Sequence, residues 1–134
     1  MDNKKKFEKP ELEIIEFMGL PMGYVRSGAK DHGRQNQIEG KLLPRQKVVV
    51  VEDLISTAGS CLEVVEVLRE AGAEVLGIVS IFTYGMKKGL DRLAAAKVEN
   101  HSLSNLDVLA EVAVREQYIS TEEKQELIEF RNNL

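Results

Sequence analysis

The sequence has 134 residues, with a single cysteine, Cys61, no tryptophan and only 5% aromatic residues. One cysteine cannot form an internal disulfide, and Cys61 has no companion ligands at the spacing of a zinc site. A reducing compartment is therefore expected. We interpret Cys61 as a small buried side chain, with a thiol acidified by a neighbouring helix start as the alternative.

Long apolar runs and an excess of positive charge are also absent. No segment approaches the roughly 20 apolar residues that a membrane helix needs, and residues 1–9 are polar and lysine-rich, unlike a signal peptide. The formal net charge is -4, with 43% hydrophobic and 30% charged residues, which is ordinary for a soluble globular protein. We expect a cytoplasmic protein that binds neither membrane nor nucleic acid. The length predicts one domain, residues 1–134, whose first nine residues form a polar tail.

Neither of the two common nucleotide phosphate loops occurs, since the chain has no G-x-x-x-x-G-K-[ST] and no G-x-G-x-x-G after a strand. The outstanding motif is instead VVVVEDLISTAGS at residues 48–60. Its four valines predict a strand buried on both faces, as in a parallel sheet, because β-branched side chains pack well on a pleated surface. Ligands of open α/β sheets bind outside the carboxyl ends of strands, which is where Glu52 and Asp53 then lie.

Small and hydroxyl-bearing residues 56–60 follow the acids, and Cys61, Val65 and Leu68 then recur at helical spacing up to Gly72, a plausible C-cap. A helix start presents free N–H groups and a partial positive charge, so this turn is predicted to bind phosphate. Glu52 and Asp53 would repel phosphate, and we assign them to sugar hydroxyls near a divalent cation. Both can reach one ligand only if the chain already turns at Asp53. The alternative is that one of them caps the helix or faces solvent.

A second polar segment, residues 26–37, lies between a strand expected at Leu20–Val25 and a short strand expected at Ile38–Gly40. Its cations and histidine are donors suited to a pyrophosphate leaving group, and glycine-flanked loops of this kind can close over a reaction. The alternative is a solvated surface loop.

The rest of the chain continues the α/β pattern. A helix is expected at residues 10–18, a second buried strand at 74–82, a helix around Leu90, Leu93 and Ala94, and an edge strand at 98–103. A further helix opens at residues 104–107 with Leu106, Leu109, Ala110 and Ala113 inward, and the last one opens at Ser120 in a capping-box pattern.

Residues 48–60 resemble the phosphoribosyl pyrophosphate signature of type I phosphoribosyltransferases. Residues 24–33, with Lys-Asp-His-Gly at 30–33, resemble the mobile catalytic loop of orotate phosphoribosyltransferases. The resemblance implies an α/β fold with a parallel β-sheet flanked by helices, here shortened at its N-terminus. It also implies transfer of phosphoribosyl from phosphoribosyl pyrophosphate to orotate, which yields orotidine 5'-monophosphate and pyrophosphate in pyrimidine biosynthesis.

The resemblance further implies roles for individual residues. Phosphoribosyl pyrophosphate would be bound by Arg26, Lys30, His32, Glu52, Asp53, Leu54, Ile55, Ser56, Thr57, Ala58, Gly59 and Ser60. Lys30, Asp31 and His32 would be catalytic, with Asp31 helping in proton transfer, and Ser56 would also reach orotate. Mg²⁺ would be bound through pyrophosphate and ribose rather than by a direct protein ligand, and the loop would reach the partner's site in a homodimer.

Two other functions stay open at this point. The chain could be a non-catalytic binder of phosphoribosyl compounds, or a regulator with the same fold that binds nucleic acid. Net acidity and the lack of a basic, aromatic-rich face argue against the regulator.

Overall fold

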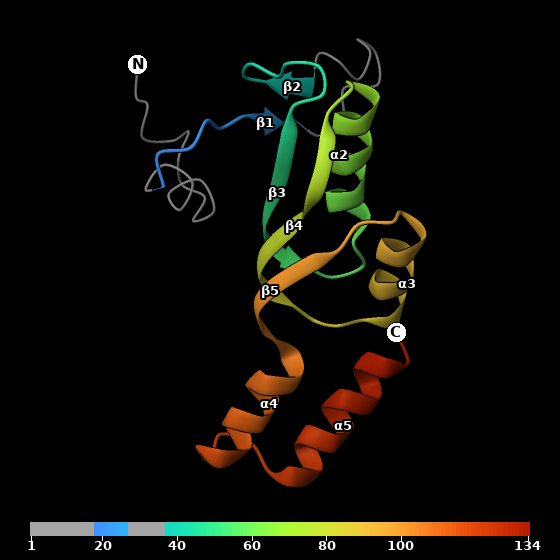
Figure 1. Cartoon of the computed structure of the whole chain (residues 1–134). Coiled ribbons are helices and arrows are strands. Elements are labelled where there is room, and N and C mark those ends of the chain that lie inside the picture. The colour runs from blue at the N-terminus through green and yellow to red at the C-terminus, as the bar shows by residue number, and fades with distance from the viewer. Residues whose placement is uncertain (1–17, 27–36) are drawn as a thin grey trace.

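The computed structural model describes residues 18–26 and 37–134 (Figure 1). Its elements are β1 Tyr24–Val25, β2 Ile38–Glu39, β3 Lys47–Ile55, α2 Gly59–Glu70, β4 Glu74–Thr83, α3 Lys87–Ala95, β5 Asn100–Asn105, α4 Leu106–Arg115 and α5 Thr121–Asn132. The polar tail, the helix expected at residues 10–18 up to residue 17, and Lys30, Asp31 and His32 lie outside the described residues.

A three-stranded parallel sheet in the order β3-β4-β5 forms the centre of the described chain. Helix α2 connects β3 to β4 and helix α3 connects β4 to β5, so the predicted βαβ architecture is confirmed (Figure 1). Strand β5 lies at an edge as expected, although it starts at Asn100 rather than at residue 98. Within the described residues, β3 forms the other edge.

The core lies between this sheet and the two helices. Ile78 and Val50 of the sheet are buried against Cys61, Val65 and Leu68 of α2, the helical face that the residue spacing predicted. The expected end of α2 is also confirmed. Ala71 is the C-cap, and the following Gly72 has φ +91°, a backbone conformation that glycine adopts without steric cost.

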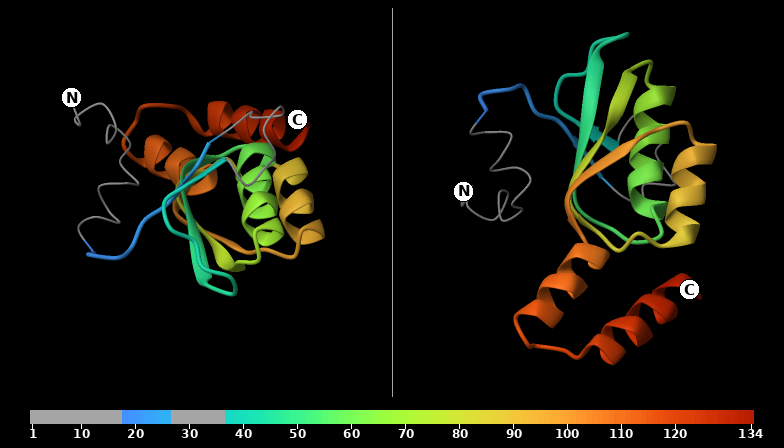
Figure 2. Two further views of the ribbon diagram at one scale, coloured as in Figure 1. Left: turned by 90° about the horizontal axis from the view of Figure 1, so that it is seen from above. Right: turned by 60° about the horizontal axis from the view of Figure 1, so that its bottom comes forward.

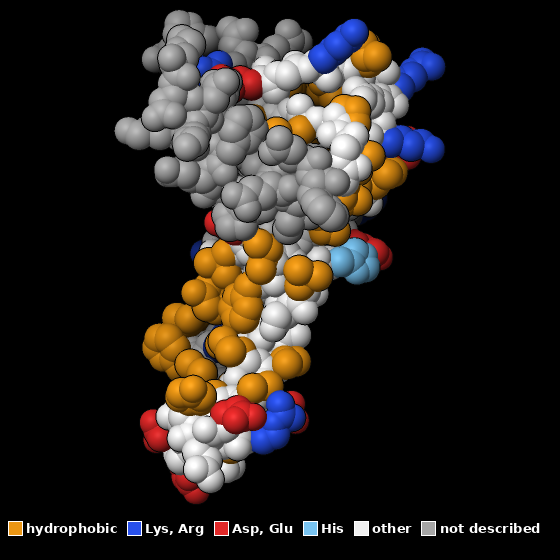
Figure 3. All heavy atoms as spheres, turned by 90° about the vertical axis from the view of Figure 1, so that its left-hand side faces the viewer, with side chains coloured by type: hydrophobic (Ala, Val, Ile, Leu, Met, Phe, Trp, Pro, Cys, Tyr) orange, Lys and Arg blue, Asp and Glu red, His pale blue; other side chains and the backbone are white. Residues whose placement is uncertain are grey.

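The valine strand is not buried on both faces, contrary to the prediction. Val49 is 50% exposed and Leu76 of β4 is 56% exposed. The cause is the strand order. Two consecutive right-handed crossovers that add strands in one direction place both helices on the same face, as Figures 1 and 2 show for α2 and α3. Hydrophobic side chains of the described residues gather on the opposite side of the molecule (Figure 3).

Helices α4 and α5 form a helical hairpin that continues from β5 and extends away from the sheet (Figure 1). The Ser120 side chain accepts from the Glu123 N–H at 3.1 Å, and the Glu123 side chain accepts from the Ser120 N–H, so the predicted capping box is confirmed. Of the residues predicted to point inward from α4, Ala110 is buried and Leu106 and Ala113 are half-buried, but the prediction for Leu109 is wrong. Leu109 is 52% exposed because α4 packs mainly on α5 and the end of β5.

Strands β1 and β2 form a short antiparallel ladder that packs on the core through Val25 and Ile38. The first strand is shorter than predicted, since only Tyr24 and Val25 of residues 20–25 are paired. The ladder closes at the base of residues 27–36. There the Arg26 N–H donates to the Gln37 carbonyl at 2.7 Å, and the Gln37 Nε2 donates to the Arg26 carbonyl at 2.9 Å.

Candidate active site

Strand β3 carries the two acids toward the carboxyl end of the sheet. The chain does not turn at Asp53, which was the condition for both acids to reach one ligand. The ladder to β4 continues through Leu54 opposite Phe82 and Ile55 opposite Thr83. The turn begins after Ile55, because β4 is long enough to pair with β3 up to that residue. Consecutive strand residues point to opposite sides of the backbone, so Glu52 and Asp53 point in different directions.

The two acids also differ in their surroundings. Glu52 is half-buried opposite Ser80 and lies close enough to α2 to act on the Cys61 thiol. Asp53 is exposed, and its Oδ1 accepts from the Leu54 N–H at 2.8 Å. Asp53 therefore presents its carboxylate to solvent, whereas Glu52 presents its carboxylate near the start of α2.

Cys61 is buried, as predicted, and the alternative of an acidified thiol is wrong. Burial and, to a smaller extent, the negative charge of Glu52 together raise the pKa of the Cys61 thiol from 9.0 to about 11. The Cys61 Sγ donates to the Ala58 carbonyl at 3.3 Å. The thiol thus stays protonated near neutral pH and contributes packing at the first turn of α2.

Residues 56–60 form the predicted turn into a helix. Ala58 is the N-cap of α2 in the left-handed conformation, with φ +64°, and no side chain of the described residues caps this end. The first turn of α2 also contains no acidic residue. The first N–H groups of a helix have no acceptor within the helix, so this terminus offers donors and a partial positive charge to an anion. Ser56 and Ser60 are exposed beside it, while Ile55 and Ala58 are buried.

The β4–α3 connection supports the start of this turn. The carbonyl of Ile55 accepts from the Tyr84 N–H at 3.1 Å and from the Thr83 Oγ1 at 3.3 Å. The same hydroxyl accepts from the Gly85 N–H at 3.2 Å. The residue immediately before Ser56 therefore accepts two hydrogen bonds from the end of β4, and the third, from the Gly85 N–H, orients the Thr83 hydroxyl.

Helix α3 supports the turn from its other side, through two residues that sequence reasoning missed. Arg92 Nη1 donates to the Thr57 carbonyl at 3.2 Å. Gly89 packs directly on the backbone, since a Cβ at this position would lie 2.6 Å from the Ser56 carbonyl oxygen. An isolated glycine inside a helical pattern was the available signal for such a close approach, whereas nothing in the sequence indicated Arg92.

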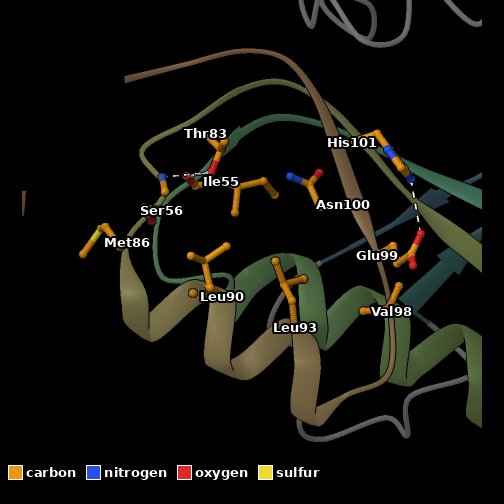
Figure 4. A pocket seen from close by; sticks show the side chains of 12 residues that line it. Ile55, Ser56, Thr83, Met86, Leu90, Leu93, Val98, Glu99, Asn100 and His101 are labelled. Atoms are coloured by element: carbon orange, nitrogen blue, oxygen red, sulfur yellow. Dashed lines mark hydrogen bonds and ion pairs between the residues drawn. The ribbon is translucent and has the colours of Figure 1, made fainter. Parts of the chain in front are cut away.

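A pocket of about 390 Å³ lies beside the turn, between α3 and the sheet (Figure 4). Ile55, Leu90 and Leu93 give it an apolar lining, of which Leu93 is buried and Leu90 is 57% exposed. The Asn100 amide also lines the pocket. Its Oδ1 accepts from the Ser80 hydroxyl at 2.9 Å, so the amide is already engaged within the sheet.

The base of the loop, where Arg26 pairs with Gln37, and the phosphate turn, residues 56–60, lie at opposite ends of the sheet (Figure 1). Arg26 is at the hairpin near the amino ends of the parallel strands, where its Nε lies 3.5 Å from Glu39 Oε1. Strand β3 has nine residues, which span roughly 26 Å between the two ends. Within one chain, the structure therefore does not bring Arg26 to residues 56–60.

The described residues, 18–26 and 37–134, contain no group of three or more histidine, cysteine, aspartate and glutamate side chains placed to hold a metal ion. Their helices include none with the length and apolar character needed to cross a membrane.

Comparison with known proteins places this site in a family. Residues 12–116 match the phosphoribosyl transferase domain family. The chain is 59% identical over 120 residues to orotate phosphoribosyltransferase of Bacillus cytotoxicus, an alignment that covers 90% of this chain and 57% of that relative. The chain thus spans little more than half the length of this relative.

Solved structures show the same likeness. UMP synthase of Leishmania donovani has a TM-score of 0.71 and 25% identity, covering 87% of this chain and 25% of that one. Orotate phosphoribosyltransferase of Mycobacterium tuberculosis in complex with phosphoribosyl pyrophosphate has a TM-score of 0.55 and 26% identity, covering 65% and 48%. Because the family match includes both the 24–33 and the 48–60 motifs, the chain belongs to the phosphoribosyl transferase domain family.

Proposed function

We propose that this chain acts as an orotate phosphoribosyltransferase of pyrimidine biosynthesis in the cytoplasm. It would transfer phosphoribosyl from phosphoribosyl pyrophosphate to orotate and release pyrophosphate. The observation that carries the proposal is the uncapped start of α2, which follows the motif of residues 48–60 in a chain 59% identical to an enzyme of that name.

In this proposal the 5'-phosphate binds at the first turn of α2. Backbone N–H groups of residues 58–60 and the hydroxyls of Ser56, Thr57 and Ser60 donate to its oxygens, assisted by roughly half a positive charge at the helix start. Ile55 and Ala58 have buried side chains and would act through the backbone alone. Of the two acids, Glu52 has its carboxylate near the start of α2 and would accept hydrogen bonds from the ribose hydroxyls. Asp53 points to the other side of the strand, so its predicted contact with the same ribose is not part of the proposal.

The chemical step is a displacement at the anomeric carbon through an oxocarbenium-like state. Catalysis therefore rests on anchoring the sugar and on stabilising the charge that develops on the departing pyrophosphate. Lys30 and His32 would donate to that pyrophosphate, Asp31 would help in proton transfer, and Ser56 would contact orotate. Mg²⁺, which prefers oxygen ligands, would be held by pyrophosphate and ribose and would act there as a Lewis acid.

The position of the loop base supports a homodimer in which the loop serves the partner's site. Residues 27–36 leave from Arg26 and return to Gln37, which are hydrogen-bonded to each other. Ten residues tied at both ends extend a backbone tip by roughly 18 Å, half their extended length. That reach falls short of the roughly 26 Å that β3 spans, so the loop is better placed to act on a second copy.

Calorimetry with phosphoribosyl pyrophosphate tests the phosphate assignment. A Cβ on Gly59 would meet Arg92 Nη1 at 3.5 Å and Thr57 Oγ1 at 3.8 Å, both ordinary contacts. Gly59→Ala should therefore bind almost as the parent does, whereas the larger branched side chain of Gly59→Val should crowd the anion site and weaken binding. A parent chain that does not bind this ligand, or a valine variant that binds as tightly as the parent, would overturn the assignment.

A non-catalytic binder of phosphoribosyl compounds is the second candidate. It is favoured by one observation, that the described residues include the uncapped helix start, which is all that phosphate binding alone requires. Orotate-dependent release of pyrophosphate separates the two functions. Release at a rate proportional to enzyme concentration supports the transferase, whereas tight binding without release supports the binder.

A further inference from the structure

Arg131, near the end of α5, is a charged residue that is only 7% exposed. Its guanidinium forms a two-pronged pair with Asp107 of α4, with Nη1 to Oδ2 at 2.9 Å and Nη2 to Oδ1 at 2.8 Å. Nη1 also donates to the Tyr84 carbonyl at 2.9 Å, and Nε donates to Asn132 Oδ1 at 2.9 Å. The side chain therefore joins both C-terminal helices to the connection between β4 and α3.

This connection is the one that holds the start of the phosphate turn. The Tyr84 carbonyl accepts from Arg131, while the Tyr84 N–H donates to the carbonyl of Ile55, the residue before Ser56. Gly85 lies against the same guanidinium, since a Cβ there would be 3.2 Å from Arg131 Nη1. A continuous set of contacts thus runs from α5 through residues 83–85 to the turn.

The chemistry of arginine suits this role. Only a planar fork with several fixed donors can bind both oxygens of one carboxylate and a backbone carbonyl together. Removing the guanidinium leaves the Tyr84 carbonyl and the Asp107 carboxylate without these hydrogen bonds. The loss therefore destabilises the β4–α3 connection, which fixes Ile55. Lysine keeps the charge but lacks the fork, which makes it the informative replacement.

We propose that Arg131 is a positioning residue for the phosphate turn, acting through Tyr84 and Ile55 to hold residues 56–60 in their binding geometry. The ligand that this turn would take, phosphoribosyl pyrophosphate, rests on the proposed function above. The role is distinct from simple docking of α5, because docking alone would not change the backbone of residues 55–60.

The experiment compares Arg131→Lys with Ser120→Ala. The second variant removes the capping box of the same helix, and so destabilises α5, without touching Tyr84. Amide hydrogen exchange at residues 55–60 and 83–85 and calorimetric titration with phosphoribosyl pyrophosphate are measured for both variants, alongside thermal midpoints. Arg131→Lys should raise exchange in both segments and weaken binding about tenfold, the loss expected for a charged hydrogen bond. Ser120→Ala should leave amide exchange in these segments and affinity for phosphoribosyl pyrophosphate near the parent values.

Equal effects of the two variants, scaling with their thermal midpoints, would overturn the proposal and make Arg131 a docking residue only. If the parent does not bind the ligand, the proposed function fails, and the exchange contrast still decides whether Arg131 positions the turn. Should Arg131→Lys not fold, Asp107→Asn takes its place. The Asp107 side chain is 57% exposed, and loss of its negative charge weakens the ion pair that holds the guanidinium in position. Unchanged exchange at residues 83–85 in that variant would equally contradict the proposal.

Discussion

Replacing Gly89 by alanine would test whether α3 sets the position of the phosphate turn. Gly89 is buried inside α3, and its Cα faces the backbone of the turn. An added Cβ would lie 2.6 Å from the Ser56 carbonyl oxygen and 3.5 Å from the Thr57 carbonyl carbon. Real Cβ atoms essentially never approach closer than 3.0 Å, so the helix and the turn must separate by at least 0.4 Å. Both neighbours are backbone atoms, which cannot rotate away as a side chain would.

Two opposing effects decide the size of the change. In an unhindered helix interior, glycine to alanine stabilises by about 1 kcal/mol, whereas overpacking a filled site typically costs about 1–3 kcal/mol. The net change in unfolding free energy should be a loss of roughly 0–2 kcal/mol. Affinity for phosphoribosyl pyrophosphate should fall more clearly, because the group displaced is the backbone of the binding turn itself.

Urea denaturation and calorimetry measure the two quantities. Lys88→Ala is the matched control, since Lys88 is the preceding residue of the same helix and is exposed. The control should match the parent in unfolding free energy and in affinity for phosphoribosyl pyrophosphate. A Gly89→Ala protein that is more stable by about 1 kcal/mol, with unchanged affinity, would contradict this reasoning. Only the higher helix propensity of alanine would then act at position 89, and α3 would not restrain the turn.

Two further predictions concern titrating groups. Because burial raises the pKa of Cys61 to about 11, its thiol should react slowly with iodoacetamide at pH 8 in the folded protein and rapidly in urea, and equal rates would contradict the burial. For this raised pKa, the contribution to stability is complete below about pH 9 and is lost as the pH rises toward 11. The hydrogen bond from Arg131 lowers the pKa of Asp107, so that pair stabilises the fold above about pH 4 and the benefit is lost on further acidification. The stability deficit of Asp107→Asn relative to the parent, measured by denaturation from pH 6 to pH 2, should shrink as the pH falls, and a constant deficit would argue against the ion pair.

The sequence predicted those features that depend on neighbouring residues. The valine run, the small-residue turn and the helical spacing after Cys61 are local signals, and together they located β3, residues 56–60 and α2. The capping box at Ser120 was predictable for the same reason, because its two hydrogen bonds join residues three apart.

Features that depend on distant residues were not predictable in this way. Strand β3 continues past Asp53 because β4 offers pairing partners up to Thr83, a length that no pattern in residues 48–60 contains. Val49 is exposed because of the order of the strands, although its own residue type favours burial. The residues that hold the turn reach it from distant positions, since Thr83 lies 28 residues after Ile55 and Arg92 lies 35 residues after Thr57.

The residues described above that restrain the phosphate turn all follow it in the chain, from Thr83 and Tyr84 through Gly89 and Arg92 to Arg131. These contacts lie within the chain and need no ligand, so the turn is already fixed. A site fixed before its ligand arrives loses less conformational freedom on binding, which favours affinity. Both an enzyme and a simple binder need that property, so tight binding of phosphoribosyl pyrophosphate supports the two equally. What distinguishes the enzyme is charge stabilisation on the leaving pyrophosphate, which the proposal assigns to the loop of residues 27–36. Turnover, and not affinity, is therefore the measurement that separates them.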